Sequence, residues 1–403
     1  MTARGEALFI TGGGTAGHVL PALAIADALV ASGVERSALR FVGSRRGMEA
    51  QLVPPRGIAL TLLPGRGVVR RPTPASAAAL AGLGVALARA LVLVAWHRPR
   101  AVVSLGGYAA LACSLAAAAL RRPLVVVNVD AVPGAVNRVT GRFARVCAVA
   151  FTGTPLPRAV VTGAPVRPEV LGVDRSPEGR ACARRRLGVG DGALVAVVGG
   201  SLGARRLNDA ALDLARRLAG RSDLLLYHVA GARNLEEVGR RRAALGSPSG
   251  SVAYRLVGFE ERMPELLAAA DLVVCRAGAS TVAELAVVGT PSILVPLPGA
   301  PGDHQRRNAD ALARAGGAIV LDDAACTGER LAGLVEELLE DPARLAEMSR
   351  AARTLGRPDA AAAIARLVAE VAAAPPSGRV PGGRGARHGE ERSPGAGARS
   401  ARR

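Results

Sequence analysis

Apolar residues along this chain form short continuous runs. The first run is followed by a glycine-rich or polar turn and then by an apolar pattern with helical spacing. Continuous apolar runs are typical of parallel β-strands that helices cover on both faces. The succession of run, glycine turn and helix opens at residues 7–11 and opens again at 193–198. Further strands are predicted at 39–42, 101–104, 124–129, 224–229, 272–275 and 292–295. The chain is therefore predicted to form two doubly wound α/β domains.

Two prolines and a glycine interrupt the pattern over residues 162–168, which is typical of a linker. We expect one domain over residues 1–165 and a second over 166–355. A last helix over 356–374 is expected to pack back on the first domain. The segment 375–403 is dominated by Pro, Gly, Ser and Arg, so it cannot form a core and is expected to be disordered.

Composition narrows the range of functions. Aromatic residues make up only 2% of the 403, which argues against platforms that stack single-stranded nucleic acid or bare sugars. All 52 basic residues are arginine, which excludes a Walker-A lysine and a Schiff-base lysine. The formal charge of +19 favours anionic partners, and seven arginines against two glutamates in 375–403 supply part of it. Binding of nucleic acid would explain the charge but not the glycine turns described below, so no nucleic-acid partner is expected.

The five cysteines are scattered without a CxxC pair, so neither a zinc site nor a disulfide framework is expected. This usage fits a reducing compartment. The first residues lack the apolar core of a signal peptide, so the chain is expected to stay in the cytoplasm.

Residues 75–96 carry a single charge, Arg89, and are long enough to raise the question of a membrane span. Because these residues are rich in Ala and Gly, they would insert only weakly into a membrane, and a buried helix is favoured. An interfacial helix is the alternative, because arginines flank the stretch on both sides: Arg66, Arg70, Arg71, Arg98 and Arg100.

The turn after the first predicted strand is the sharpest local feature. The glycines of residues 12–17 let the backbone approach a ligand and aim N–H groups from a helix N-terminus, a geometry that binds phosphate. The spacing also fits a dinucleotide fingerprint, but the acidic residue expected about 20 residues on is not well placed. His18, which ends the turn, is a candidate general base. The alternatives are a purely structural turn and a histidine that only caps its helix.

The second half has an equivalent turn at residues 199–203, which adds the hydroxyl of Ser201. Arg205 and Arg206 follow in the first helical turn, where they either face an anion or form a solvated face. In open parallel sheets, ligands bind beyond the carboxyl ends of the strands. If the two halves face each other, both turns point into one cleft with two phosphate-binding mouths.

Two further turns follow strands of the second half. In the first, the Glu284 carboxylate can return towards the turn and hold two adjacent hydroxyls such as a ribose diol; a capping box with Thr281 is the alternative. The second is the polar turn 302–308, for which a simple N-cap by Asp303 is the alternative. The strand ends carry no Asp-x-Asp pair and no His/Cys cluster. We therefore expect no metal and no other cofactor, and a diphosphate held by glycine turns, helix dipoles and arginines.

The ordered set of these turns resembles the MurG family of N-acetylglucosaminyltransferases, over residues 7–370. The resemblance opens with Gly13-Gly14-Thr15-Ala16-Gly17-His18 and the helical residues 21–26. It continues in family order through 106–108, 133–138, 162–167, 199–204, 276–284 and 303–305 with Asn308. It implies a GT-B glycosyltransferase fold, in which two Rossmann-like doubly wound domains face a cleft.

The resemblance also implies an activity. N-acetylglucosamine is transferred with inversion from UDP-N-acetylglucosamine to the muramyl C4 hydroxyl of lipid I, an undecaprenyl-diphosphate-linked muramyl-pentapeptide. The product is lipid II, for peptidoglycan synthesis. The stretch 75–96 would then dock on an anionic membrane surface, which places the protein peripherally on the cytoplasmic face of the cell membrane.

The family's site residues map onto matching positions of this sequence. Ser201 meets the donor diphosphate, Arg167 lies near the nucleotide and Glu284 binds the ribose diol. Gln305 hydrogen-bonds to sugar hydroxyls. The turn before Glu284 lines the phosphates with Ala279, Ser280, Thr281, Val282 and Ala283. The acceptor and the transferred sugar are faced by Thr15, Ala16, Gly17 and the candidate catalytic residue His18.

Two stretches depart from the family's pattern. Where the family has His-Glu-Gln-Asn or something close, this chain has 127–130, which ends in Asp130. An aspartate can accept hydrogen bonds from sugar hydroxyls, but it cannot donate them and it adds negative charge near a diphosphate. The region of uracil contact differs too, at 259–263. A divergent paralogue with another lipid or a secondary-metabolite acceptor is therefore the first alternative, and a nicotinamide-dependent Rossmann oxidoreductase is the alternative of another class.

Overall fold

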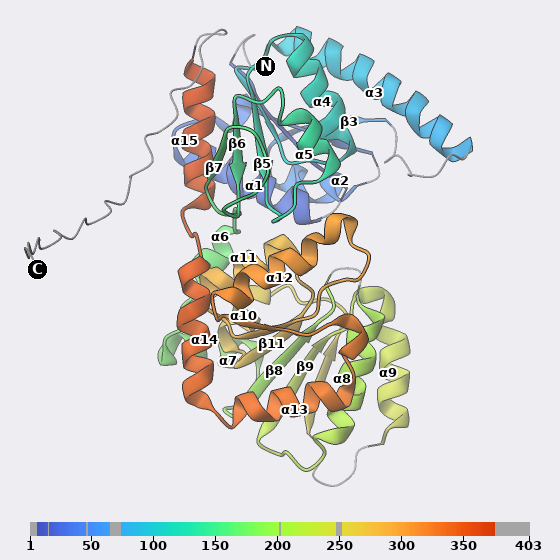
Figure 1. Ribbon diagram of the computed structural model, residues 1–403, viewed down its shortest axis with the longest axis vertical. Coiled ribbons are helices and arrows are strands. Elements are labelled where there is room, and N and C mark those ends of the chain that lie inside the picture. Colours follow the sequence, from blue (N-terminus) through green and yellow to red (C-terminus); the bar gives the residue numbers. More distant parts are fainter. Residues whose placement is uncertain are drawn as a thin grey trace, which may run out of the picture.

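A computed structural model describes residues 6–14, 16–45, 47–64, 74–200, 203–246 and 252–374 of the protein. It contains two sheets whose strand pairs all run parallel. In Figure 1 the two halves lie one above the other along the long axis, each with helices around its sheet. The predicted pair of doubly wound α/β domains is confirmed. The segment 375–403, expected to be disordered, lies outside the described residues.

The first sheet has the strand order β3-β2-β1-β4-β5-β6-β7. Its strands are β1 (Leu8–Thr11), β2 (Leu39–Ser44), β3 (Ala59–Leu63), β4 (Ala101–Ser104), β5 (Leu124–Asn128), β6 (Val146–Val149) and β7 (Ala159–Val161). Alternate strand residues point to opposite faces. Leu8 and Ile10 pack with α1 (Ala16–Ala31) and α15 (Ala360–Ala373). Phe9 packs on the other face with α3 (Pro74–His97) and α4 (Tyr108–Ala119).

The second sheet has the strand order β10-β9-β8-β11-β12-β13. Its strands are β8 (Ala193–Val198), β9 (Leu224–Val229), β10 (Ala253–Val257), β11 (Leu272–Cys275), β12 (Ser292–Leu294) and β13 (Ala318–Val320). One face is covered by α7 (Pro177–Leu187), α10 (Met263–Ala269), α11 (Ala279–Val288) and α12 (His304–Arg314). The other face is covered by α8 (Arg205–Arg217) and α13 (Gly328–Leu339).

The remaining elements are short or connect the halves. They are α2 (Glu49–Leu52), α5 (Ala135–Thr140), α6 (Pro168–Leu171), α9 (Leu235–Ala244) and α14 (Pro342–Leu355), with 3-10 turns at Arg36–Ala38, Pro54–Arg56, Ala232–Asn234, Pro301–Asp303 and Asp323–Ala325. After α14 the chain returns to the first half. There Ile364 and Val368 of α15 lie in the same core as Leu8 and Ile10. Figure 1 shows α15, in red, running alongside the upper half.

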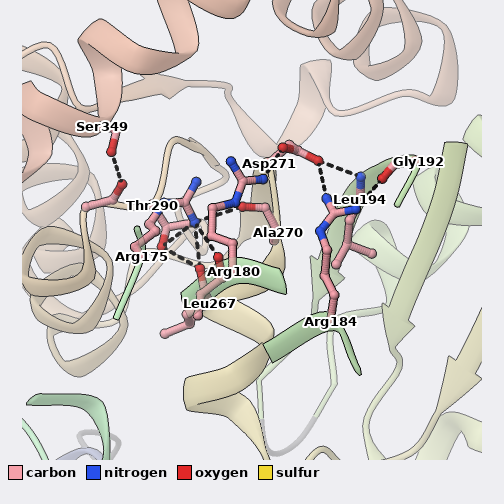
Figure 2. A network of polar contacts seen from close by, with 12 residues as sticks. Arg175, Arg180, Arg184, Gly192, Leu194, Leu267, Ala270, Asp271, Thr290 and Ser349 are labelled. Carbon is pink, nitrogen blue, oxygen red and sulfur yellow. Dashed lines mark hydrogen bonds and ion pairs between the residues drawn. The ribbon is translucent and has the colours of Figure 1, made fainter. Parts of the chain in front are cut away.

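A network of arginines ties the amino ends of the strands in the second half, as Figure 2 shows. Asp271, directly before β11, pairs with Arg180, and its Oδ2 accepts from Arg184 at 2.9 Å and from the Leu194 N–H of β8 at 2.8 Å. Arg175 donates to three backbone carbonyls within residues 267–270 at 2.8–3.2 Å. Ligand sites in such sheets lie at the carboxyl ends, so these arginines hold the fold rather than a ligand.

The helix over residues 75–96 differs from the buried helix that its composition favours. One face of α3 packs into the core through Ala86, Ala90 and Val94. The opposite face is open: Val92 is 70% exposed and Trp96 61% exposed. Within the described part of the chain, no helix is long and apolar enough to cross a membrane. A stretch of small apolar residues therefore forms a surface helix that presents apolar side chains.

Candidate active site

The first glycine turn connects β1 to α1 at the carboxyl edge of the first sheet. Gly14 has φ of +95°, a conformation that side chains other than glycine rarely adopt. Gly17 lies exposed in the first turn of α1, and Ala16 begins that helix. Thr15 lies outside the described residues, so its role stays a prediction.

His18 lies in the first turn of α1 and is partly exposed. Burial lowers the pKa of its imidazole, while the Asp130 carboxylate, a hydrogen bond to the Gly13 backbone and the Glu49 carboxylate act in the opposite direction. His304, from the second half, also lowers the pKa of His18. The imidazole is therefore neutral at pH 7 and able to accept a proton. His18 is therefore coupled electrostatically to groups of both halves of the molecule.

Asp130 is held by a residue of the second half. Asn308, on α12, is completely buried, and its Nδ2 donates to Asp130 Oδ1 at 3.0 Å and to the Ala277 carbonyl at 3.1 Å. Asn308 Oδ1 accepts from the Ala131 N–H at 2.8 Å. Within the first half, Asn128 Nδ2 donates to the Asp130 carbonyl at 2.6 Å. One Asp130 oxygen is thus engaged in joining the halves, and its predicted contact with a sugar hydroxyl falls to the other.

Glu284 and Arg167 form an ion pair between α11 and the N-terminus of α6. Both Nε and Nη2 of Arg167 lie 3.0 Å from Glu284 Oε1. Burial raises the pKa of the Glu284 carboxyl, and Arg167 opposes this shift. The capping-box alternative is wrong, because α11 begins at Ala279 behind an N-cap at Gly278 that makes no side-chain cap. Glu284 Oε2 makes none of the hydrogen bonds found among the described residues.

The turn before Glu284 presents mostly backbone groups to a ligand. Val282 is buried in the core of the second half, and Ala279 is buried against the core of the first. Ala283 packs against both cores. Ser280 Oγ is buried with no hydrogen-bond partner among the described residues, and Thr281 is partly exposed. A ligand here would therefore meet the N–H groups of α11 and these two hydroxyls.

The remaining predicted residues lie on neighbouring loops. Gln305, near the start of α12, accepts through Oε1 from the Leu297 N–H at 3.0 Å, which directs its amide group along that loop. Arg206 donates to the carbonyls of Asp323 and Ala324, both at 2.9 Å, so it ties a loop and does not reach out to an anion. Asp303 makes no side-chain cap to α12. Ser201 lies outside the described residues, and its role stays a prediction.

A second polar network lies beneath the turn at 199–203. Asn208 Nδ2 donates to the Ala230 carbonyl at 3.1 Å, so its Oδ1 accepts from His228 Nε2 at 2.9 Å. His228 Nδ1 must then accept from the Tyr254 hydroxyl, at 2.5 Å. Burial lowers the pKa of His228 to about 4. The Ala230 carbonyl and the Asn234 amide pack directly against Gly203, so this neutral network supports the turn.

Four residues of the site went unpredicted: Glu49, Asn128, His228 and the role of Asn308 across the halves. Glu49, His228 and Asn308 each have a partner at least 20 residues away, so local patterns do not reveal these contacts, whereas Asn128 bonds to the nearby Asp130. Glu49 had one local signal, because it begins the helix after a strand whose end lies between two glycines, Gly43 and Gly47. Among the described residues, no group of His, Cys, Asp and Glu is arranged to hold a metal ion.

Known proteins match this chain along nearly its full described length. Residues 8–149 match the glycosyltransferase family 28 N-terminal domain, and residues 194–364 match the glycosyltransferase family 28 C-terminal domain. Two curated relatives bear the name UDP-N-acetylglucosamine--N-acetylmuramyl-(pentapeptide) pyrophosphoryl-undecaprenol N-acetylglucosamine transferase. The one from Acidothermus cellulolyticus is 42% identical, and the one from Desulforudis audaxviator is 38% identical; each match covers 91% of this chain and 98% of the relative.

A solved structure matches as well. The crystal structure of MurG from Acinetobacter baumannii superposes with a TM-score of 0.73 at 30% identity, over 91% of this chain and 99% of that one. The predicted GT-B fold is thereby confirmed, and the nicotinamide-dependent alternative is set aside. With relatives this similar along both halves, the chain belongs to the MurG family of glycosyltransferases, within glycosyltransferase family 28.

Proposed function

We propose that this glycosyltransferase moves N-acetylglucosamine from UDP-N-acetylglucosamine to the muramyl C4 hydroxyl of lipid I and so makes lipid II for peptidoglycan. The observation that carries the proposal is the hydrogen bond from Asn308 of the second half to Asp130 of the first, the carboxylate that is coupled electrostatically to His18, where the two halves of a MurG-family chain meet. Relatives that match this chain along nine-tenths of its length are named for this reaction.

The donor is held by the second half. The carboxylate of Glu284, fixed by Arg167, accepts hydrogen bonds from the ribose hydroxyls. The N-terminus of α11 and the turn at 199–203 direct N–H groups to the diphosphate, where the helix dipole favours negative charge. Gln305 donates from its amide to sugar hydroxyls. These roles require no metal ion, because N–H groups and arginines offset the charge of the leaving UDP.

The reaction itself is one displacement. The acceptor C4 oxygen attacks the anomeric carbon, and the bond from that carbon to the β-phosphate oxygen breaks, so UDP leaves with the electron pair. The C4 hydroxyl proton passes to a base, and the neutral imidazole of His18 serves as that base. The Asp130 carboxylate stabilises the imidazolium that forms, since it already favours the charged state of His18.

The test is release of UDP by the purified protein with UDP-N-acetylglucosamine and a lipid I analogue. Turnover with this pair, and none with UDP-glucose, supports the proposal. The alternative acceptor suggested by Asp130 is tested in the same assay with other lipid-linked and aglycone acceptors. Donor binding without turnover on lipid I, together with turnover on another acceptor, would identify a paralogue instead.

The surface of α3 fits a membrane-docking role and a peripheral position on the cytoplasmic face of the cell membrane. Val85, Arg89, Val92 and Trp96 follow helical spacing along one exposed face, and Arg98 is exposed beside them. Apolar side chains with flanking arginines are typical of helices that lie at an anionic interface. The flanking arginines at 66, 70 and 71 lie outside the described residues.

Sedimentation with vesicles tests this surface. The Val92→Ser/Trp96→Ser variant is expected to lose at least about tenfold in affinity for phosphatidylglycerol vesicles, because burial of each side chain contributes about 1.5–3 kcal/mol. Leu235→Ser, at an exposed apolar residue of the second half, is the matched control. Equal binding by both variants would contradict docking through α3.

A further inference from the structure

A buried carboxylate lies against the first glycine turn. Glu49 begins α2, the element that follows β2 along the chain, and its side chain is completely buried. Its Oε1 accepts from the Gly14 N–H at 3.2 Å, from the Ser44 N–H at 2.9 Å and from the Ser44 hydroxyl at 3.2 Å. The carboxylate therefore joins the turn to the end of the neighbouring strand.

Three glycines make room for this carboxylate. A Cβ at Gly13 would lie 1.8 Å from Glu49 Oε1, and a Cβ at Gly47 would lie 1.7 Å from Oε2. A Cβ at Gly43 would lie 2.8 Å from Glu49 Cγ. Glu49 makes no ion pair with another described residue, and its Oε2 has no hydrogen-bond partner among them. The local sequence thus encloses a negative group beside the turn.

This carboxylate changes what the turn can bind. A glycine turn at a helix N-terminus binds phosphate through unpaired N–H groups and the positive end of the helix dipole. Here the Gly14 N–H is already bound, and a carboxylate lies where it repels a second anion. The turn at 199–203 has different neighbours, because Gly203 packs against the neutral Asn234 amide. Among the described residues, the two turns therefore have neighbours of different charge.

We propose that Glu49 is the specificity-determining and positioning residue of the first turn: it excludes phosphate there and leaves the turn to neutral sugar hydroxyls next to His18. This inference rests on the proposed function, in which the second turn holds the donor diphosphate. It replaces the expectation of two phosphate-binding mouths with one. The acceptor's diphosphate is accordingly bound away from the turn at 12–17.

Inorganic pyrophosphate is the probe. Glu49→Gln keeps an oxygen that accepts from Gly14 and Ser44 but removes the charge. In protein saturated with UDP and in about 0.3 M salt, which screens surface arginines, pyrophosphate should raise the melting temperature of Glu49→Gln and leave that of the wild type unchanged. In initial-rate assays at saturating donor, inhibition by pyrophosphate should strengthen by at least about tenfold in Glu49→Gln.

Asp27→Asn is the matched control, because it removes the same charge at the far end of α1, where Asp27 pairs with Arg56 at 2.8 Å. It should respond to pyrophosphate as the wild type does. An equal response of Glu49→Gln and wild type would overturn the proposal. If Glu49→Gln does not fold, the wild type decides: further stabilisation of the UDP-saturated protein by pyrophosphate, abolished by His18→Ala, would also overturn it. A wild type that UDP does not stabilise would instead count against the proposed function.

Discussion

The Arg167–Glu284 pair offers the sharpest test of the donor site. Both guanidinium contacts end on Glu284 Oε1, each at 3.0 Å, which leaves Oε2 to accept from a ribose hydroxyl. Glu284→Ala removes this acceptor. A hydrogen bond to a charged group contributes about 1.5–3 kcal/mol, and each 1.4 kcal/mol is tenfold in affinity. The donor KM is therefore expected to rise about 10- to 150-fold.

Initial rates of UDP release against UDP-N-acetylglucosamine concentration measure this effect. Glu169→Ala is the matched control, because Glu169 is an exposed acid on α6 whose one ion pair among the described residues is with Arg56, at 3.3 Å. Its donor KM should stay at the wild-type value. Thermal unfolding without donor reports how much stability Glu284→Ala loses through the broken pair with Arg167. A Glu284→Ala donor KM within about twofold of wild type would refute the ribose role.

Three further predictions address single residues. His18→Ala should lower kcat by at least about 100-fold with little loss of stability. Because burial lowers the pKa of His18, wild-type activity should fall only below pH 6.5. If the variant lost melting temperature as strongly as activity, the role of His18 would be structural. His228 has a folded pKa of about 4 against 6.5 unfolded, so the unfolded state binds the extra proton and stability falls as pH drops from 6.5 towards 4, by about 2–3 kcal/mol at pH 4.5. Urea unfolding of wild type and His228→Gln at pH 6.5 and pH 4.5 measures this slope. Asn308→Ala should cost about 2–4 kcal/mol, because it leaves the Ala277 carbonyl and the Ala131 N–H without their partner; a loss below about 1 kcal/mol in urea unfolding would contradict that account.

Patterns within the chain predicted the central strands of each sheet but missed the edge strands and β6, the neighbour of an edge strand. Every predicted strand is present, and 101–104, 224–229 and 272–275 match β4, β9 and β11 end to end. Four of the missed strands, β3, β7, β10 and β13, lie at sheet edges. β7 and β13 are apolar but only three residues long each, and a run this short is not recognised as a strand from the sequence.

Candidate site residues could be predicted where a single turn contains them, but not where two segments distant in the sequence come into contact. Gly14 lies in a turn, and His18 and Glu284 lie in helices that follow turns, at positions that the local spacing marked as candidates. The residues that contact these turns from other parts of the chain carry no such local signal. Glu49 is 35 residues from Gly14, and Asn308 is 178 residues from Asp130. Local sequence shows the donors that a turn can offer, whereas tertiary packing decides which of them are already bound.

The charge of the protein must likewise be divided between arginines that packing has already paired and arginines that it leaves exposed. A formal +19 is an argument for an anionic partner only for those arginines that packing leaves exposed. Arg175 and Arg184 point to backbone carbonyls inside the second half, and Arg276 pairs with Asp323 while it donates to two more carbonyls. A chain without lysine uses guanidinium groups where their several donors satisfy several acceptors at once. The proposed membrane docking therefore rests not on the sum of charges but on their place, because exposed arginines and exposed apolar side chains occur together on and beside α3.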